Sequence, residues 1–147
     1  MFFSGRVRKL NEKVALSVLI ERVKQHLNLK NVRLALGVSH SLDTPVQTIA
    51  LCAGSGGSVV KNTRADVVLT GEMSHHEVIA GKSFIAHKIF TDSHLVAVHN
   101  GASVILCEHS NTERGYLRVF REKLAVALGE KVEVVVSATD ADPLVMY

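Results

Sequence analysis

A histidine and a glutamate stand four residues apart in the stretch CEHSNTERG, which follows an apolar run. One helical turn would bring His109 and Glu113 to the same face, and an imidazole with a carboxylate suits zinc, manganese or iron. A structural explanation is equally good, because Ser110 and Glu113 fit a capping box at a helix start, where the helix dipole favours a carboxylate. Spacing alone leaves both open, and two ligands would need others from elsewhere in the fold or from another chain.

The stretch TGEMSHHE, residues 70–77, places more side chains of this kind after a predicted strand. Ligands of open parallel sheets bind beyond the carboxyl ends of the strands, which is where Glu72, His75 and His76 are expected. Neighbouring histidines on a helix point about 100° apart and rarely chelate one ion together. We therefore expect one of them to face a polar site and the other to be solvated, with Glu72 as a candidate supporting group.

The stretch CAGSGGS lies between a predicted strand and a predicted helix. Its glycines would let the backbone approach a ligand, and N–H groups at such a turn attract anions. The spacing fits neither the dinucleotide fingerprint nor a P-loop, so a tight turn with a serine N-cap is the alternative. The candidate anion-binding residues are Gly54, Ser55, Gly56, Gly57 and Ser58.

Composition narrows the class of protein. The chain has 147 residues, 47% hydrophobic and 21% charged, which predicts one globular domain without a span of about 20 apolar residues. The N-terminal apolar stretch is too short for a signal peptide, so the cytoplasm or nucleus is the expected location. Basic residues are scattered despite a net charge of +3, which argues against direct nucleic-acid binding. Cys52 and Cys107 are expected to be small core residues, with a disulfide as the less favoured alternative.

The hydrophobic pattern predicts an α/β fold, with a layered sheet, βαβ units and covering helices. A strand, glycine loop, short helix and strand are expected over 46–72. The other expected elements are helices over 15–28, 74–81 (with Ser74 as N-cap) and 111–130, and strands over 32–38, 102–109 and 131–138. Residues 82–100 are longer and more apolar than an ordinary connection, so we interpret them as an insertion.

Three stretches together resemble one known family. ALCAGSGGSV (50–59), ADVVLTGEMSHHE (65–77) and VILCEHSNTERGYL (104–117) are similar to the C-terminal half of the Nif-three-like (Ngg-one-interacting factor three) family. Bacterial relatives are described as GTP cyclohydrolase I type 2 homologues. The resemblance runs from about residue 5 to residue 145 and implies one Nif-three-like C-terminal α/β domain over 1–147.

The resemblance also implies a site. Members of the family hold two divalent metal ions between two related halves and form ring-like oligomers. The C-terminal half supplies a histidine and a glutamate in a motif that matches His109 and Glu113. Because the paired histidines and the aspartate of the N-terminal half have no counterpart here, we expect weak metal binding by this chain.

The resemblance leaves two classes of function open. Eukaryotic members are described as partners of transcriptional regulators, which makes a metal-binding regulatory or adaptor protein the favoured hypothesis. The alternative is a metal-dependent hydrolase of the GTP cyclohydrolase I type 2 kind, or an inactive fragment of either. In the hydrolase, the metal ions would activate water, and Glu72 or His75 would support a ligand or transfer a proton.

Overall fold

The computed structural model describes residues 5–60, 63–79 and 101–142. Its backbone contacts divide the chain into two compact units, residues 1–112 and 113–147, which are described separately below. The predicted insertion at 82–100 and the tail from Pro143 lie outside the described residues. No helix among the described residues is long and apolar enough to cross a membrane.

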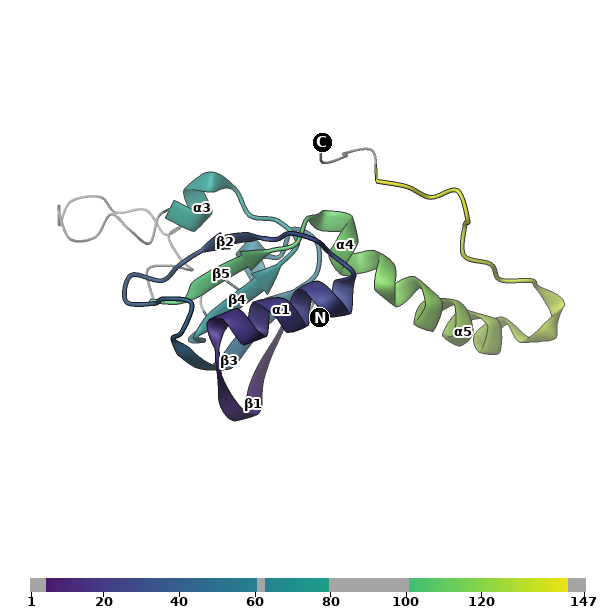
Figure 1. The fold of residues 1–147 in the computed structure, drawn as a ribbon. Coiled ribbons are helices and arrows are strands. Elements are labelled where there is room, and N and C mark those ends of the chain that lie inside the picture. Colours follow the sequence, from purple (N-terminus) through teal and green to yellow (C-terminus); the bar gives the residue numbers. More distant parts are fainter. Residues whose placement is uncertain (1–4, 61–62, 80–100, 143–147) are drawn as a thin grey trace. The chain divides into compact units, whose positions relative to one another are not determined.

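The first unit is built on one mixed sheet (Figure 1). The five strands are β1 (Gly5–Ala15), β2 (Arg33–Ala35), β3 (Pro45–Cys52), β4 (Val67–Thr70) and β5 (Ser103–Leu106). They are ordered β1-β3-β4-β5-β2, and the three central strands are parallel while each edge strand runs antiparallel to its neighbour. The parallel strands end at one edge of the sheet, which is therefore where a ligand site is expected.

Helices follow β1, β3, β4 and β5. They are α1 (Leu16–Leu27), α2 (Gly57–Val60), α3 (His75–Ile79) and α4 (His109–Glu113). The predicted helix over 15–28 is confirmed as α1, and the predicted pattern over 46–72 is confirmed as β3, α2 and β4. The mixed α/β class predicted from the sequence is thus confirmed.

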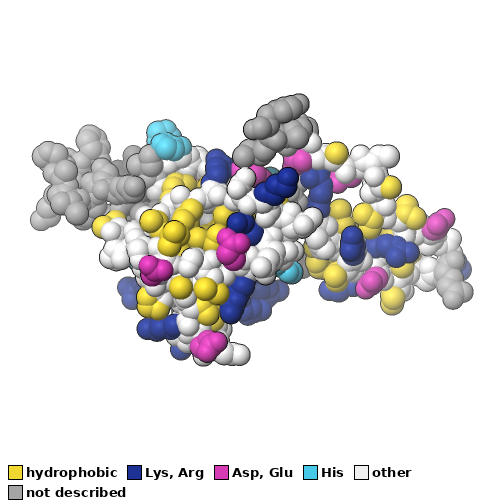
Figure 2. All heavy atoms as spheres, viewed as in Figure 1, with side chains coloured by type: hydrophobic (Ala, Val, Ile, Leu, Met, Phe, Trp, Pro, Cys, Tyr) yellow, Lys and Arg dark blue, Asp and Glu magenta, His cyan; other side chains and the backbone are white. Residues whose placement is uncertain are grey.

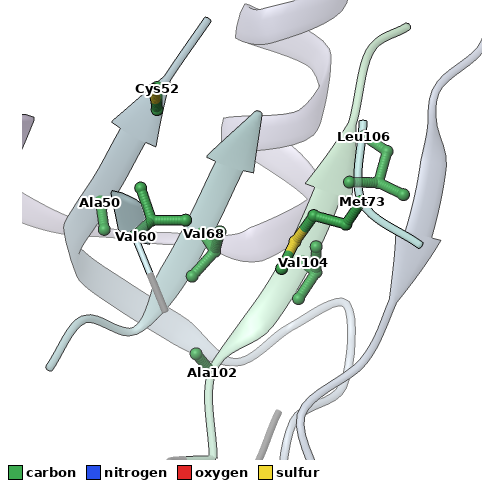
Figure 3. Packing of buried hydrophobic residues seen from close by; sticks show 8 residues of the cluster. All are labelled: Ala50, Cys52, Val60, Val68, Met73, Ala102, Val104 and Leu106. Atoms are coloured by element: carbon green, nitrogen blue, oxygen red, sulfur yellow. The ribbon is translucent and has the colours of Figure 1, made fainter. Parts of the chain in front are cut away.

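Alternating side chains along the parallel strands form two separate cores. One face of the sheet packs on α1, through Leu16, Leu19, Val23, Val46, Ile49, Val67, Ile105 and Cys107. The opposite face packs on α2 and the turn after β4, as Figure 3 shows, through Ala50, Cys52, Val60, Val68, Met73, Ala102, Val104 and Leu106. Because both faces of the central strands are covered, their runs are almost continuously apolar, as parallel strands usually are.

Both cysteines belong to these cores, on opposite faces of the sheet. They are buried and free, so the expectation of small core residues is confirmed and the disulfide alternative is wrong. Burial raises the pKa of the Cys107 thiol to about 11, with a smaller contribution from Glu108. A thiol of this kind is protonated at neutral pH and is a poor nucleophile.

The second unit, after residue 112, is mainly helical. The turn η2 (Arg114–Tyr116) leads into α5 (Leu117–Leu128), and η3 (Gly129–Lys131) follows. No residue of α5 is buried, and Figure 2 shows its apolar side chains at the surface among Lys and Arg. In the described part of this unit, Arg114 binds Asp140 and Asp142 at 2.7 and 3.4 Å.

Two element predictions need correction, and one strand was missed. The expected strand over 131–138 is not formed, because a strand needs a partner and the described part of the second unit contains no other strand. The expected helix over 111–130 begins earlier, at His109, and is broken into α4, η2 and α5. Strand β1 was not predicted, because its polar sequence lacks the apolar alternation of a half-buried strand.

Candidate functional site

The candidate site lies beyond the carboxyl ends of β3, β4 and β5. The turn after β3 carries Ser55, the turn after β4 carries Glu72, and the first residue of α4 after β5 is His109. These side chains form one contact group, hereafter the Ser55–Glu72–His109 cluster. Glu72 Oε1 lies 2.8 Å from His109 Nδ1 and accepts a hydrogen bond of 2.6 Å from Ser55 Oγ.

The electrostatics of the cluster favour an ionised carboxylate. Hydrogen bonds from Ser55 and then His109 hold the pKa of Glu72 below its ordinary value, although desolvation opposes them. The side chains of His109 and Glu72 are 46% and 44% exposed, so both remain accessible to small ligands. The cluster therefore offers an anionic oxygen and an imidazole at the edge of the sheet.

A strained backbone positions the histidine. Glu108, which separates β5 from α4, has a φ of 66°, in the left-handed region that costs a non-glycine residue about 1 kcal/mol. Its side chain forms an ion pair of 2.9 Å with Arg33 of β2. Asn111 and Thr112 bond back to the carbonyls of Cys107 and His109, at 2.8 Å each, and complete the turn.

The glycine loop is held by one carbonyl. Gly54 O accepts hydrogen bonds from the backbone N–H groups of Gly56, Gly71 and Glu72 and from the Thr70 hydroxyl, at 2.9 to 3.1 Å. A Cβ on Gly71 would lie 2.8 Å from this oxygen, so only glycine fits there without a shift. The loop thereby fixes the start of the turn that carries Glu72.

The predicted anion role of residues 54–58 stays a prediction. Gly54 N–H donates to Thr112 Oγ1 and Gly56 N–H donates to Thr70 Oγ1, at 2.9 and 3.0 Å. These two N–H groups are therefore used in hydrogen bonds within the protein, which supports the tight-turn alternative for this part of the loop. Ser58 is exposed and is the second residue of α2, a helix of four residues, so the predicted serine N-cap at this position is wrong.

The paired histidines lie apart from the cluster on α3. Both are exposed, and their rings meet edge to face with centroids 6.4 Å apart. The predicted role of Ser74 is confirmed: its hydroxyl accepts from Glu77 N–H at 3.2 Å, and Glu77 Oε2 accepts from Ser74 N–H at 2.7 Å. This pair is a reciprocal capping box. A supporting role for His75 or His76 stays a prediction.

Glu113 is the last residue of α4 and the first of the second unit. The α-helix already begins at His109, so Ser110 lies inside it and not at the N-cap that a capping box requires. The capping box predicted for Ser110 and Glu113 is therefore wrong, because the helix starts two residues earlier than expected. Ligation by Glu113 is not tested by this geometry and stays a prediction.

A polar pocket adjoins the cluster. It has a volume of about 440 Å³, and its lining residues are Arg33, Ser55, Gly57, Ser58, Glu72, Met73, Ser74 and Glu77. Sequence reasoning proposed Ser55 and Glu72 for other reasons. It missed Arg33, which lines the pocket, and Thr112, whose hydroxyl accepts from Gly54 N–H beside it. Nothing in their local sequence marks them, because both reach the site only through strand pairing and the α4 turn.

The ligand atoms of the cluster are of the kind that transition metals bind, but the cluster has too few of them for a complete site. Imidazole nitrogen and carboxylate oxygen are the donors that zinc, manganese and iron accept. In the part of the chain that the structure describes, no three His, Cys, Asp or Glu side chains converge as a metal-binding group. The described residues of the cluster therefore offer part of a metal site.

Sequence comparison identifies the family. The family model of Duf34/NIF3 (NGG1p interacting factor 3) matches residues 3–143. The chain belongs to the Duf34/NIF3 family. It is 50% identical to NIF3-like protein 1 of Rattus norvegicus over 140 residues, which cover 95% of this chain and 33% of that protein. The chain thus spans about a third of the length of this curated relative.

Two solved structures have a similar fold. Staphylococcus aureus protein SA1388 superposes with a TM-score of 0.69 at 20% identity, over 97% of this chain and 37% of that one. A Bacillus cereus protein related to NIF3 gives 0.64 at 26% identity, over 97% and 36%. The resemblance noted in the sequence to this family is therefore confirmed, as is the fold it implies.

Proposed function

We propose that this chain is a divalent-metal-binding member of the Duf34/NIF3 family that acts as a regulatory adaptor for transcriptional regulators, in the cytoplasm and nucleus. One observation supports the metal site most directly. The chain folds Glu72 and His109, 37 residues apart, into a hydrogen bond of 2.8 Å at the carboxyl edge of a parallel sheet. Metal-ligating histidines commonly bond a carboxylate in this way.

In this proposal His109 and Glu113 are metal ligands, and Glu72 supports His109. Zinc, manganese or iron would supply the charge that holds the ligands together. Further ligands would come from sequence that the longer relatives contain, or from another copy in a homo-oligomer. Binding by this chain alone is therefore expected to be weak.

The adaptor role is supported by the family description, which names an NGG1p interacting factor. Its regulator partner would be a protein. On the face that Figure 2 shows, Lys and Arg lie among acidic and apolar side chains. Binding of the purified chain to purified NGG1p, with and without residues 82–100, tests this role. Equal binding by both forms would exclude the insertion as the docking surface, and no binding by either would contradict the adaptor role.

A hydrolase is the second candidate, and the polar pocket of about 440 Å³ next to Glu72 favours it. Pockets of this size hold small molecules. Incubation of the metal-loaded chain with GTP, followed by chromatography of the nucleotide, separates the candidates. Metal-dependent turnover would replace the adaptor proposal by the hydrolase.

Elemental analysis of the purified full chain tests the metal ligands. We expect His109→Ala to lose most of the bound metal, whereas His26→Ala, an exposed histidine on α1, should keep the metal content of the unchanged protein. Glu113→Gln should lower metal content before it lowers the melting temperature. Equal metal in all variants would remove the site assignment. A large fall in melting temperature of Glu113→Gln in metal-free buffer would favour the helix-stabilising role instead.

A further inference from the structure

A groove on the α1 face of the sheet shares no residue with the Ser55–Glu72–His109 cluster. It has a volume of about 290 Å³ and lies between the second half of α1 and the carboxyl ends of β3 and β4. Small molecules are commonly held in mostly apolar pockets with a few polar groups, and in α/β sheets these lie at the carboxyl ends of the strands. The groove therefore has the position of a ligand site.

The floor of the groove is made of hydrocarbon side chains. Val23 and Leu27 of α1 form one side, and Leu51 of β3 and Leu69 of β4 form the other. Val23 is buried, whereas the three leucines are only partly buried and pack against the core on this face. Covering partly exposed leucines with an apolar group removes hydrocarbon surface from water, which is favourable. The floor residues therefore favour a ligand with an apolar body.

The side of the groove that faces solvent adds a positive charge. Arg22 lines it and is exposed. Among the described residues Arg22 forms no ion pair, because its neighbour Glu21 binds Lys24 at 2.8 Å. None of the described lining residues is acidic. A guanidinium presents paired N–H donors that match a carboxylate, so charge complementarity selects an apolar ligand with a carboxylate at one end.

We propose that this groove binds a medium-chain carboxylate, with its alkyl chain on the four floor residues and its carboxylate on Arg22. A cavity of about 150 Å³ holds benzene, and the groove is about twice as large. That volume is enough for about twelve non-hydrogen atoms, which is the size of decanoate. The site goes beyond the proposed metal-binding adaptor and does not depend on it.

Titration of the purified full chain with decanoate, followed by methyl ¹H–¹³C NMR, tests the site. We expect the methyl signals of the floor residues to shift, with a dissociation constant on the order of 0.1 mM. Octanoate should bind about 15-fold more weakly than decanoate, because each buried methylene strengthens binding about fourfold. The alcohol 1-octanol, which lacks the charge, should bind about fivefold more weakly than octanoate.

Two substitutions locate the ligand. Ala53 lines the groove and is exposed, so Ala53→Leu fills the groove without displacing the core and should weaken decanoate binding roughly tenfold. Arg22→Gln should weaken decanoate binding about fivefold and leave 1-octanol binding unchanged. The matched controls are Ala127→Leu and Arg8→Gln, an exposed alanine of α5 and an exposed arginine of β1, which should bind decanoate as the unchanged protein does. Circular dichroism checks that every variant is folded.

Several results would overturn the inference. Floor methyl signals that do not shift with decanoate would remove the site, and equal decanoate affinity in Ala53→Leu and Ala127→Leu would place the ligand elsewhere. Equal binding of octanoate and 1-octanol would mean that Arg22 recognises no carboxylate. If Ala53→Leu alone lowered the mass of the ligand-free chain in sedimentation, a second copy and not a carboxylate would occupy the groove. None of these measurements depends on metal, so the proposed metal site is tested separately.

Discussion

The two ends of the parallel strands both carry polar groups, but they use them differently. At the carboxyl end, the Ser55–Glu72–His109 cluster joins side chains to one another, and all three residues are at least partly exposed. At the amino end, Asp66 and Ser103 bond mainly to backbone N–H groups. The amino end therefore uses its side chains to join strands, whereas the carboxyl end joins side chains to one another, which is the arrangement that the proposed site requires.

The amino-end contacts fasten neighbouring strands. Asp66 Oδ2 accepts from the N–H groups of Gln47 and Thr48 at 2.7 and 2.8 Å, which ties β4 to β3. Ser103 is fully buried; its hydroxyl accepts from Gly37 N–H at 3.1 Å and lies 2.8 Å from His40 Nδ1. Removing either side chain leaves buried or half-buried donors without their acceptor, which costs stability.

The largest loss in the free energy of unfolding is expected for a substitution in the glycine loop at the carboxyl end, where the loop contacts the core. A Cβ on Gly56 would lie 2.5 Å from Cys52 Cβ and against Thr70 Oγ1, and neither atom belongs to a flexible chain end. Gly56→Ala should therefore lower the free energy of unfolding by about 3 kcal/mol, measured by urea denaturation. Gly115→Ala is the matched control, since nothing lies within 4 Å of its Cβ. Similar losses in both variants would show that the loop is not tightly packed.

The next largest loss of stability is expected on removal of the Asp66 side chain, and this loss depends on pH. Burial raises the pKa of Asp66, but the hydrogen bonds from Thr48 and Gln47, with a contribution from His40, outweigh it and leave the pKa below its ordinary value. A lowered pKa in the folded state gives stability that is present above the unfolded-state pKa and is lost as the pH falls through the folded value. Asp66→Ala should cost about 2 kcal/mol at pH 7.

This difference should shrink as the pH falls below about 4, the ordinary range for an aspartate. Unfolding curves at a series of pH values measure it, and Asp43→Ala, an exposed aspartate in the loop before β3, serves as the control. A constant difference between the unchanged protein and Asp66→Ala across the series would show that the carboxylate charge is not what stabilises the amino end.

The contrast between the two ends was only partly accessible from the sequence. The βαβ pattern predicted β3, α2 and β4, because hydrophobic periodicity is a local property. A helix between two strands makes them parallel, which placed Glu72 and His109 at one edge of the sheet. The contact of Ser55 with Glu72 was not predicted, since it depends on how the glycine loop turns around Gly54 O. The strand predicted over 131–138 failed for a related reason: pairing is decided by a partner elsewhere in the chain and not by the apolar run itself.

The smallest changes in the free energy of unfolding are expected for two serine substitutions, one at each end of the strands. Ser103→Ala leaves the buried N–H of Gly37 without its acceptor and should lower the free energy of unfolding by about 1 kcal/mol. Ser55→Ala removes an exposed hydroxyl and should change it by less than about 0.5 kcal/mol. Thermal unfolding in chelator-treated buffer measures both. If Ser55→Ala proved as destabilising as Ser103→Ala, the carboxyl-end cluster would stabilise the fold in the same way as the amino-end contacts. The functional contrast between the two ends would then be lost.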